Sequence, residues 1–375
     1  MEIVEKRGAP LHSCDGARHR AQGDPPRQPR FQSLLYGGPE RAPLSQDLYN
    51  FEKGPDRFLY PPVTGILLVP FAFSSEWHVH QFVWHGLLGF FVFLLARGSW
   101  PALFAMMIVS RYLAINLGYG QINVAVLALV VGAHLALERR SRWAAPLWAL
   151  ASFVKVYPLA QGMEFLLRRR WRELGLAALA AALLLALPAL VWGWDQSWRL
   201  HGDFLRALEG KGMPLHSHNQ SISALLLRIF TKETFVLHAY GWTTWGFVEL
   251  PPAAVRAAAL LAGALATAWG WLRAHRRRLP LDYAAATAFS LLFLSHIVWK
   301  DYFLFLFLPL RQLIAEKPVR WKWWVGAYAA MVTLSAPDLL THKITVWLDA
   351  WSIHFWAAII LWTAWLRIPP RTNNP

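Results

Sequence analysis

Ionisable side chains within apolar sequence are the feature of this chain most suggestive of chemistry, because a charge at the centre of a membrane span costs about 3 kcal/mol on insertion scales. Lys155 lies in a short break between apolar runs, and Lys300-Asp301-Tyr302 joins two others, with His296 one turn earlier. A lysine in such a place binds a phosphate or pairs with a carboxylate inside the protein. A neighbouring carboxylate can act as a general base. These residues are the first candidates for a functional site.

Uncharged polar residues mark two further positions. Gln121 and Asn123 open an apolar run after Gly120, while His216, His218 and Asn219 close a long polar loop. Gln121 and Asn123 either contact a substrate or form hydrogen bonds between helices, as polar residues in membrane bundles often do. We expect all of these residues to lie on or near one side of a membrane.

The composition excludes an ordinary soluble globule. The chain has 375 residues, of which 56% are hydrophobic and 16% charged, against about 25% charged residues in soluble domains. Its 37 Lys and Arg outnumber its 22 Asp and Glu, which in so apolar a chain indicates cytoplasmic loops and anionic lipid headgroups rather than nucleic acid. The one cysteine, Cys14, excludes an internal disulfide and a cysteine-based metal site.

The apolar runs predict an all-α polytopic membrane bundle with about 8 to 11 spans, re-entrant half-helices included. Residues 174–194 and 120–137 are uncharged and about long enough to cross a hydrocarbon core of ~30 Å as helices. Three shorter apolar pieces occupy residues 61–74, 101–117 and 143–167. Eight longer runs are the expected spans: 77–96, 120–137, 174–194, 257–272, 283–299, 302–314, 323–337 and 346–366.

Basic clusters predict the orientation, because short loops rich in Lys and Arg stay on the cytoplasmic side. They place residues 195–251 in an extracytoplasmic loop. The stretch 143–167 has basic flanks on both sides and is too short to cross twice, so we expect a re-entrant pair of helices broken at Lys155 to Pro158, since proline disfavours helix before it. Irregular backbone at membrane depth lines a cavity or is buried in protein. The clusters lie at 139–142, 168–172, 273–278 and 317–322, and at Arg367 with Arg371.

The first 45 residues contain no apolar run and are rich in Pro, Gly, Arg and Asp. They form either a tail or surface loop, or they reflect a displaced start with a first span missing. Residues 46–375 are expected to form a single membrane domain.

Five motifs, in this order along the chain, resemble those of the polyprenyl-phosphate-sugar-dependent glycosyltransferases of the GT-C fold, and specifically glycosyltransferase family 87. The resemblance covers about residues 44 to 315. The motifs are Tyr60-Pro61-Pro62 before an apolar run, Gly120-Gln121-x-Asn123, Lys155-x-x-Pro158 with the basic run 168–172, Asn219-Gln220-Ser221, and Trp299-x-x-Tyr302.

The resemblance implies a multi-pass enzyme of a bacterial plasma membrane whose active site faces outward. Such an enzyme takes a hexose, usually mannose, from a polyprenyl-phosphate carrier and passes it to an acceptor hydroxyl. Its partners would be the lipid-linked donor, a glycolipid or glycan acceptor and membrane lipids, with no nucleic acid. Because the leaving group is a monophosphate, we expect no metal ion and no cofactor besides the donor itself.

The resemblance also implies roles for individual residues. Asp24 falls by spacing at the family's catalytic Asp, although Pro25-Pro26 follows it and no span precedes it. Many members carry His immediately before the Tyr of the Trp-x-x-Tyr stretch, where this chain has Asp301. Either Asp301 or His296 takes the role of that His, or the role is absent. The implied substrate-binding residues are Tyr60, Gln121, Asn123, Lys155, His218, Asn219, Lys300 and Tyr302.

Two other interpretations remain open from the residues. A secondary transporter or lipid carrier would also have broken helices and buried charges at membrane depth. Such proteins usually show paired broken segments in two halves, whereas the broken segments here fall mainly in the N-terminal half. The third interpretation is a catalytically inactive family relative, motivated by the missing first span and by Asp301 in place of His.

Overall fold

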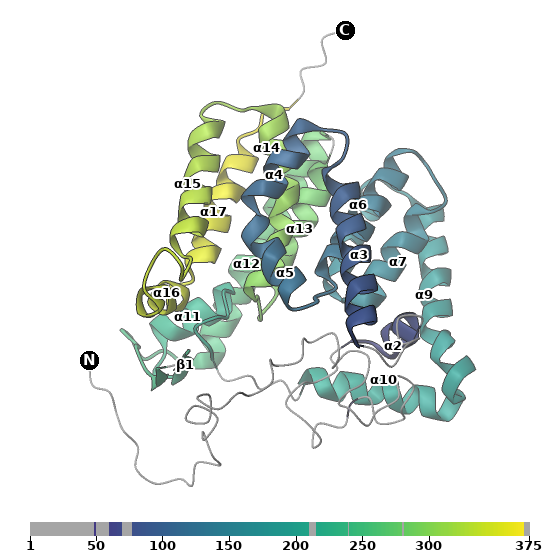
Figure 1. Ribbon diagram of the computed structural model, residues 1–375, viewed down its shortest axis with the longest axis horizontal. Helices are drawn as coiled ribbons and strands as arrows, with labels where there is room; N and C mark the ends of the chain where they lie inside the picture. The colour runs from purple at the N-terminus through teal and green to yellow at the C-terminus, as the bar shows by residue number, and fades with distance from the viewer. Residues whose placement is uncertain are drawn as a thin grey trace.

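The computed structural model describes residue 49 and residues 60–69, 77–209, 215–238, 240–279 and 281–370. It confirms an all-α membrane protein (Figure 1). In chain order the elements are α2 Pro62–Leu68, α3 Trp77–Ala96, α4 Trp100–Ile108, α5 Ser110–Gly118, α6 Asn123–Glu138, α7 Ala144–Val154, η5 Tyr157–Gln161, α8 Gly162–Leu167, α9 Trp171–Trp192, α10 Trp194–Glu209, α11 Ile222–Phe230, β1 Phe235–Leu237, β2 Gly241–Thr243, α12 Pro252–Arg277, α13 Asp282–Leu294, η6 Lys300–Leu306, α14 Phe307–Glu316, α15 Trp321–Leu334, α16 His342–Ala350 and α17 Ile353–Leu366.

Three helices within the described residues are long and apolar enough to cross a membrane, namely α3, α9 and α12. Two bent pairs, α4 with α5 and α16 with α17, raise the number to five if each pair is one span. Large apolar side chains such as Leu190 on α9 and Leu261 on α12 are exposed. Such exposure is unfavourable in water but normal against lipid, so these helices face the hydrocarbon.

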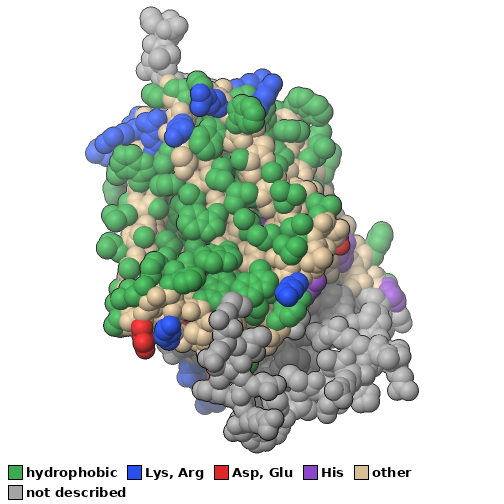
Figure 2. Space-filling view, turned by 90° about the vertical axis from the view of Figure 1, so that its left-hand side faces the viewer, with side chains coloured by type: hydrophobic (Ala, Val, Ile, Leu, Met, Phe, Trp, Pro, Cys, Tyr) green, Lys and Arg blue, Asp and Glu red, His purple; other side chains and the backbone are tan. Residues whose placement is uncertain are grey.

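The two ends of the bundle differ in charge. Figure 2 shows Lys and Arg side chains gathered at one end of the molecule, above a wide band of hydrophobic side chains. The loops after α6, α8 and α14 lie at this end, which we call the basic end, while α10, α11 and α16 lie at the other, the opposite end (Figure 1). This separation agrees with the cytoplasmic placement of basic loops.

The re-entrant pair predicted at 143–167 is present. Helix α7 stops at Lys155, whose backbone is extended (φ −145°, ψ 139°), and η5 and α8 return to the starting end. The rings of Trp148 and Phe165 stack at 4.9 Å, and Ala144 and Phe165 share a buried cluster with Leu137. Both arms of the pair therefore end beside the end of α6, as the flanking basic residues require.

Three predicted spans differ from one continuous α-helix. The run 302–314 begins within the 3₁₀ helix η6 and becomes α-helical only at Phe307. The run 346–366 is not one helix, because α16 and α17 meet at 57°. The run 283–299 stops being helical at Leu294. At the break between α16 and α17, Gln220 Nε2 donates to the Asp349 carbonyl (2.8 Å) and Arg228 donates to Ser352 Oγ (2.6 Å). After α13, Asn219 and Ser221 both donate to the His296 carbonyl. Side chains from 219–228 therefore satisfy groups that a continuous helix would occupy.

The core centres on α13, whose residues from Asp282 to Phe293 are all buried. Its neighbour α12 approaches closely through Gly263, where a Cβ would lie 2.2 Å from the Phe293 carbonyl oxygen. Any other residue at 263 would push the two helices apart. This contact fixes the end of α13 and hence the start of the extended segment that leads to η6.

Helix α10 lies across the opposite end of the bundle rather than along it (Figure 1). It buries Leu200, Phe204 and Ala207 against Tyr49 and exposes Trp198. Such an amphipathic helix is suited to the interface between lipid and water. Tyr49 also donates a hydrogen bond to the Tyr60 carbonyl (2.5 Å), which connects α10 to the first of the candidate site residues.

Candidate functional site

The first three residues of η6 reach into two polar clusters at the opposite end. Asp301 and Tyr302 contact residues of α5, α6 and the break after α7, and this group is called the Asp301 cluster. Lys300 contacts α16, and this second group is called the Asp349 cluster. Because a short 3₁₀ helix turns its side chains in three directions, adjacent residues can serve both clusters.

Two buried asparagines hold Asp301. Asn123 Nδ2 donates to Asp301 Oδ2 (2.8 Å) and to Asn116 Oδ1 (2.9 Å), and Asn116 Nδ2 donates to the Asp301 carbonyl (2.9 Å). Both asparagines have no exposed surface, whereas Asp301 is 9% exposed. These bonds fix the orientation of the carboxylate, and neutral donors do so without cancelling its charge.

Lys155 lies between two tyrosine rings at the break of the re-entrant pair. Its ammonium is 4.9 Å from the centre of the Tyr302 ring and 5.5 Å from that of Tyr60. Tyr157, two residues on, donates a hydrogen bond to Asn123 Oδ1 (3.2 Å). Lys155 is half-buried, so aromatic faces stabilise its charge while part of the side chain stays accessible to an anion.

The Asp349 cluster brings three basic side chains to one buried carboxylate. Lys300 Nζ lies 2.6 Å from Asp349 Oδ2, His218 Nε2 lies 3.5 Å from the same oxygen, and His354 Nε2 lies 3.6 Å from Oδ1. Tyr112 shares a hydrogen bond with the other nitrogen of His354 (2.8 Å). Burial of Asp349 as a charge requires such partners, and Lys300 and His218 both keep exposed surface.

Asn219, another predicted site residue, lies near these clusters and holds the main chain of the segment before η6 in place. Asn219 Nδ2 donates to the His296 carbonyl (3.0 Å), as does Ser221 Oγ (2.9 Å), and Asn219 Oδ1 accepts from the Val298 amide (3.0 Å). The Asn219-Gln220-Ser221 motif therefore fastens the segment before η6. The His296 side chain is exposed.

Gln121 is buried, and its backbone amide donates to the Asn116 carbonyl (2.7 Å). Gln121 thus lies beside the Asp301 cluster, and the contact is made by its backbone amide. Asp24 lies outside the described residues, so its predicted catalytic role stays a prediction.

Sequence reasoning missed Asn116, Asp349 and His354. Asp349 was the only carboxylate within the run 346–366 predicted to span the membrane, and a charge in such a place indicates a functional site. Arg111, a charge within the apolar run 101–117, donates to the carbonyls of Val332 and Ser335 at the end of α15. Arg111 therefore has a structural role.

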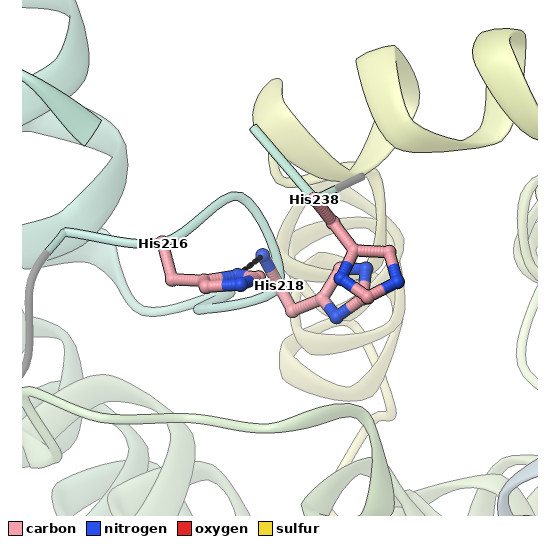
Figure 3. Close-up of side chains that lie close together, drawn as sticks. All are labelled: His216, His218 and His238. Carbon is pink, nitrogen blue, oxygen red and sulfur yellow. Dashed lines mark hydrogen bonds between the residues drawn. The ribbon is translucent and has the colours of Figure 1, made fainter. Parts of the chain in front are cut away.

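Three histidines lie beside the Asp349 cluster: His216, His218 and His238 (Figure 3). Burial, with the charge of a neighbouring basic group, lowers the pKa of His216 to about 4 and the pKa of His218 to about 3. The pKa of His238 is also lowered, mainly by burial. All three rings are therefore neutral at pH 7 and carry a lone pair.

Together these contacts place carboxylates, half-buried cations and tyrosine rings at one end of a membrane bundle. A carboxylate oriented by neutral donors can take a proton from a hydroxyl. Cations that keep some exposure can stabilise negative charge as it develops on a departing phosphate.

The model of glycosyltransferase family 87 matches residues 58–296, more than half of the chain. The chain belongs to glycosyltransferase family 87. It is therefore an integral membrane glycosyltransferase, which favours the enzyme over the transporter or lipid carrier interpretation. No curated protein sequence matches the chain.

The family 87 match includes Tyr60, Asn123 and Lys155 and ends just before η6. Asp301, Tyr302 and Asp349 lie beyond it. The structure joins the matched and unmatched parts, because Asn123 bonds to Asp301 and Lys155 lies over Tyr302.

Proposed function

We propose that this chain transfers a hexose, with mannose as the first candidate, from a polyprenyl-phosphate carrier to a hydroxyl of a lipid or glycan acceptor. We further propose that the reaction takes place at the opposite end of the bundle, facing outward from a bacterial plasma membrane. The observation that carries the proposal is the meeting of Lys155, Asp301 and Tyr302 at the break of the re-entrant pair.

Lys155 and Lys300 are the proposed phosphate contacts. When the bond from sugar to phosphate breaks, the leaving phosphate gains negative charge, and a nearby ammonium lowers the energy of that transition state. Lys155, which is half-buried beside the rings of Tyr60 and Tyr302 at the break of the re-entrant pair, is the first candidate. The leaving group is a monophosphate, so we expect the transfer to need no metal ion and no further cofactor.

The proposed general base is Asp301 or Asp24. Asp301 has the geometry for this role, since Asn123 orients its carboxylate and it follows directly after Lys300. In this arrangement the acceptor hydroxyl gives its proton to the carboxylate while its oxygen attacks the anomeric carbon. Tyr60 and Tyr302 supply ring faces beside Lys155 on which a sugar can pack.

The experiment that tests the proposal measures transfer of radiolabelled mannose from polyprenyl-phosphate mannose to a glycolipid extract by the detergent-purified protein. Lys155→Ala is compared with Lys343→Ala, an exposed lysine of α16 at the same end. We expect Lys155→Ala to lower the rate by about 100-fold or more, as for loss of one transition-state contact, and Lys343→Ala to leave it unchanged.

Asp24→Asn and Asp301→Asn then separate the two possible bases, because only the variant of the true base loses the proton acceptor. Equal rates for Lys155→Ala and parent would contradict the proposed site. No transfer by the parent from any polyprenyl-phosphate hexose would favour the inactive relative.

A further inference from the structure

The three histidines beside the Asp349 cluster, which we call the histidine trio, come from two arms of one loop. His216 and His218 precede α11, and His238 follows β1. Their ring centres are 4.9 Å apart for His216 and His218, 4.3 Å for His218 and His238, and 5.9 Å for His216 and His238. Figure 3 shows the three rings gathered at one place, with those of His218 and His238 overlapping.

Backbone hydrogen bonds lock the two arms together. The Ser217 amide donates to the Val236 carbonyl (2.9 Å), the Val236 amide donates to the Leu215 carbonyl (2.7 Å), and the His238 amide donates to Ser217 Oγ (3.2 Å). The buried Arg228 of α11 also donates to the His216 carbonyl (3.0 Å). The trio is thus held in place by its scaffold, which reduces the entropy lost when the rings bind a common ligand.

A carboxylate stands behind the trio. His218 Nε2 lies 3.5 Å from Asp349 Oδ2. Histidines that bind a metal ion nearly always direct their other ring nitrogen at a carboxylate or carbonyl, which fixes the tautomer and strengthens the ligand. An N–H at Nε2 directed at Asp349 leaves Nδ1 of His218 with the lone pair.

We propose that His216, His218 and His238 bind one divalent transition-metal ion, Zn²⁺ in particular, at the opposite end of the bundle. One nitrogen from each ring lies within 4.8 Å of the others, and the site holds three neutral nitrogen donors and no thiolate. Imidazole suits Zn²⁺ with three protein ligands and an open fourth position, with Zn–N bonds of about 2.0 to 2.1 Å.

Binding requires a small closure. Bonds of that length in a tetrahedron bring the ligand nitrogens to about 3.3 Å from one another. His238 is exposed, so its ring can turn inward. His216 Nδ1 accepts a hydrogen bond from the His218 amide (3.0 Å), and this bond must be exchanged for the metal if Nδ1 is the ligand atom.

The proposed ion is separate from the sugar-transfer chemistry. It would fasten the hairpin of β1 and β2 to the loop before α11, beside Asp349, which lies 3.5 Å from His218. This inference departs from the expectation that no metal is bound, and it assigns His218 a metal ligand role where the family resemblance implied a substrate contact. It does not rest on the proposed function.

The test measures Zn²⁺ bound per chain after the detergent-purified protein is stripped with EDTA, loaded with ZnCl₂ and freed of loose metal by gel filtration. We expect one Zn²⁺ per parent chain. Loss of a residue that only hydrogen-bonds to a metal ligand weakens metal binding by about 10- to 100-fold. Loss of a ligand itself should weaken binding at least as much, so His238→Ala should lose the ion. His201→Ala, a histidine of α10 at the same end, should keep it.

Cobalt substitution and heat provide the second readout. Co²⁺ loaded in place of Zn²⁺ should give the visible absorption of a tetrahedral site in the parent and not in His238→Ala. Zn²⁺ should raise the melting temperature of the parent only, because it binds the folded state. The metal-free melting temperature of His238→Ala reports whether the variant folds. No stoichiometric ion in the parent, or binding that survives in His218→Ala and His238→Ala, would overturn the proposal.

Discussion

Charged residues at the two ends of this bundle are buried in different ways. At the basic end, Arg277 and Asp282 form an ion pair of 2.7 Å in which neither side chain has exposed surface. Gln312 donates to the same carboxylate (2.6 Å) and accepts from Trp365 (2.7 Å). The network is closed, and its partners come from α12, α13, α14 and α17.

The second network at the basic end is less closed, because Arg168 keeps 19% of its side-chain exposure. Glu164, with no exposed surface, lies 2.8 Å from His134 Nδ1 and 3.1 Å from Arg168 Nε. It fastens the returning arm of the re-entrant pair to α6. Arg168 also pairs with Glu138, so two carboxylates share its charge.

At the opposite end Asp349 is buried, but two of its three basic partners keep exposed surface. Lys300 retains 18% and His218 29% of side-chain exposure around Asp349, and Lys155 is half-buried. An ion pair that a substrate cannot reach only holds helices together. A partly exposed cation beside a fixed carboxylate can contact a substrate. The comparison therefore separates the closed pair, which holds helices together, from the cations that we propose to meet the substrate.

The largest effect on stability is expected from Arg277→Ala, which breaks the closed pair. Removing one member of a buried pair leaves the other charge uncompensated and costs about 3 to 5 kcal/mol. The melting temperature in detergent should fall steeply, while the transfer rate per folded molecule stays that of the parent.

Arg277→Met with Asp282→Leu is the control for this prediction, because it removes both charges and keeps the volume. It should melt above Arg277→Ala. A melting temperature of Arg277→Ala equal to that of the parent would mean that the basic end does not depend on the pair.

Gly162→Ala should lower stability by a smaller amount. It should also affect the site at the opposite end, because the re-entrant pair connects the two ends. A Cβ at 162 would lie 2.6 Å from the Trp148 ring, and that ring is held by a hydrogen bond to the Pro158 carbonyl (2.9 Å). Overpacking of this kind costs about 1 to 3 kcal/mol.

Because Lys155 lies three residues before Pro158, we expect the transfer rate of Gly162→Ala to fall together with its melting temperature. Gly175→Ala is the control, because a Cβ there meets nothing within 4 Å. Loss of stability with a fully retained rate would show that the break tolerates movement of Trp148.

The smallest effect is expected for Ser221→Ala. Ser221 Oγ accepts a hydrogen bond from the Ala224 amide (3.1 Å) at the start of α11, and loss of such a cap costs about 1 kcal/mol. The same hydroxyl donates to the His296 carbonyl, so the rate should fall slightly as well. Ser221→Thr keeps both bonds and should restore both values.

The sequence predicted those parts of the fold that depend on local patterns. Uncharged length located α3 and α9, and the basic flanks with Pro158 located the re-entrant pair and its break at Lys155. The break between α16 and α17 could not be predicted, because it depends on contacts from Gln220 and Arg228, which are far away in the chain. The break after α13 likewise depends on distant contacts, from Asn219 and Ser221 to the His296 carbonyl.

The candidate site was predicted in part for the same reason. Lys155, Asp301 and Asn123 carry a signal in the sequence, since each is polar within or beside an apolar run. Asn116 is one of many polar residues at a helix end, and only the fold shows that it contacts Asp301. The role of Asp349 emerges from its distance of 2.6 Å to Lys300.

The most direct test of the central claim compares Asp301→Asn at the opposite end with Asp282→Asn at the basic end. Asparagine keeps the shape of each side chain, and Asn123 can still donate to the amide oxygen at 301. Asp301→Asn should lower transfer from polyprenyl-phosphate mannose by about 100-fold or more, as for loss of a general base, with the melting temperature unchanged. Asp282→Asn should lower the melting temperature and leave the rate per folded molecule unchanged. A parent-like rate for Asp301→Asn would contradict the role of Asp301 as general base and leave that role to Asp24.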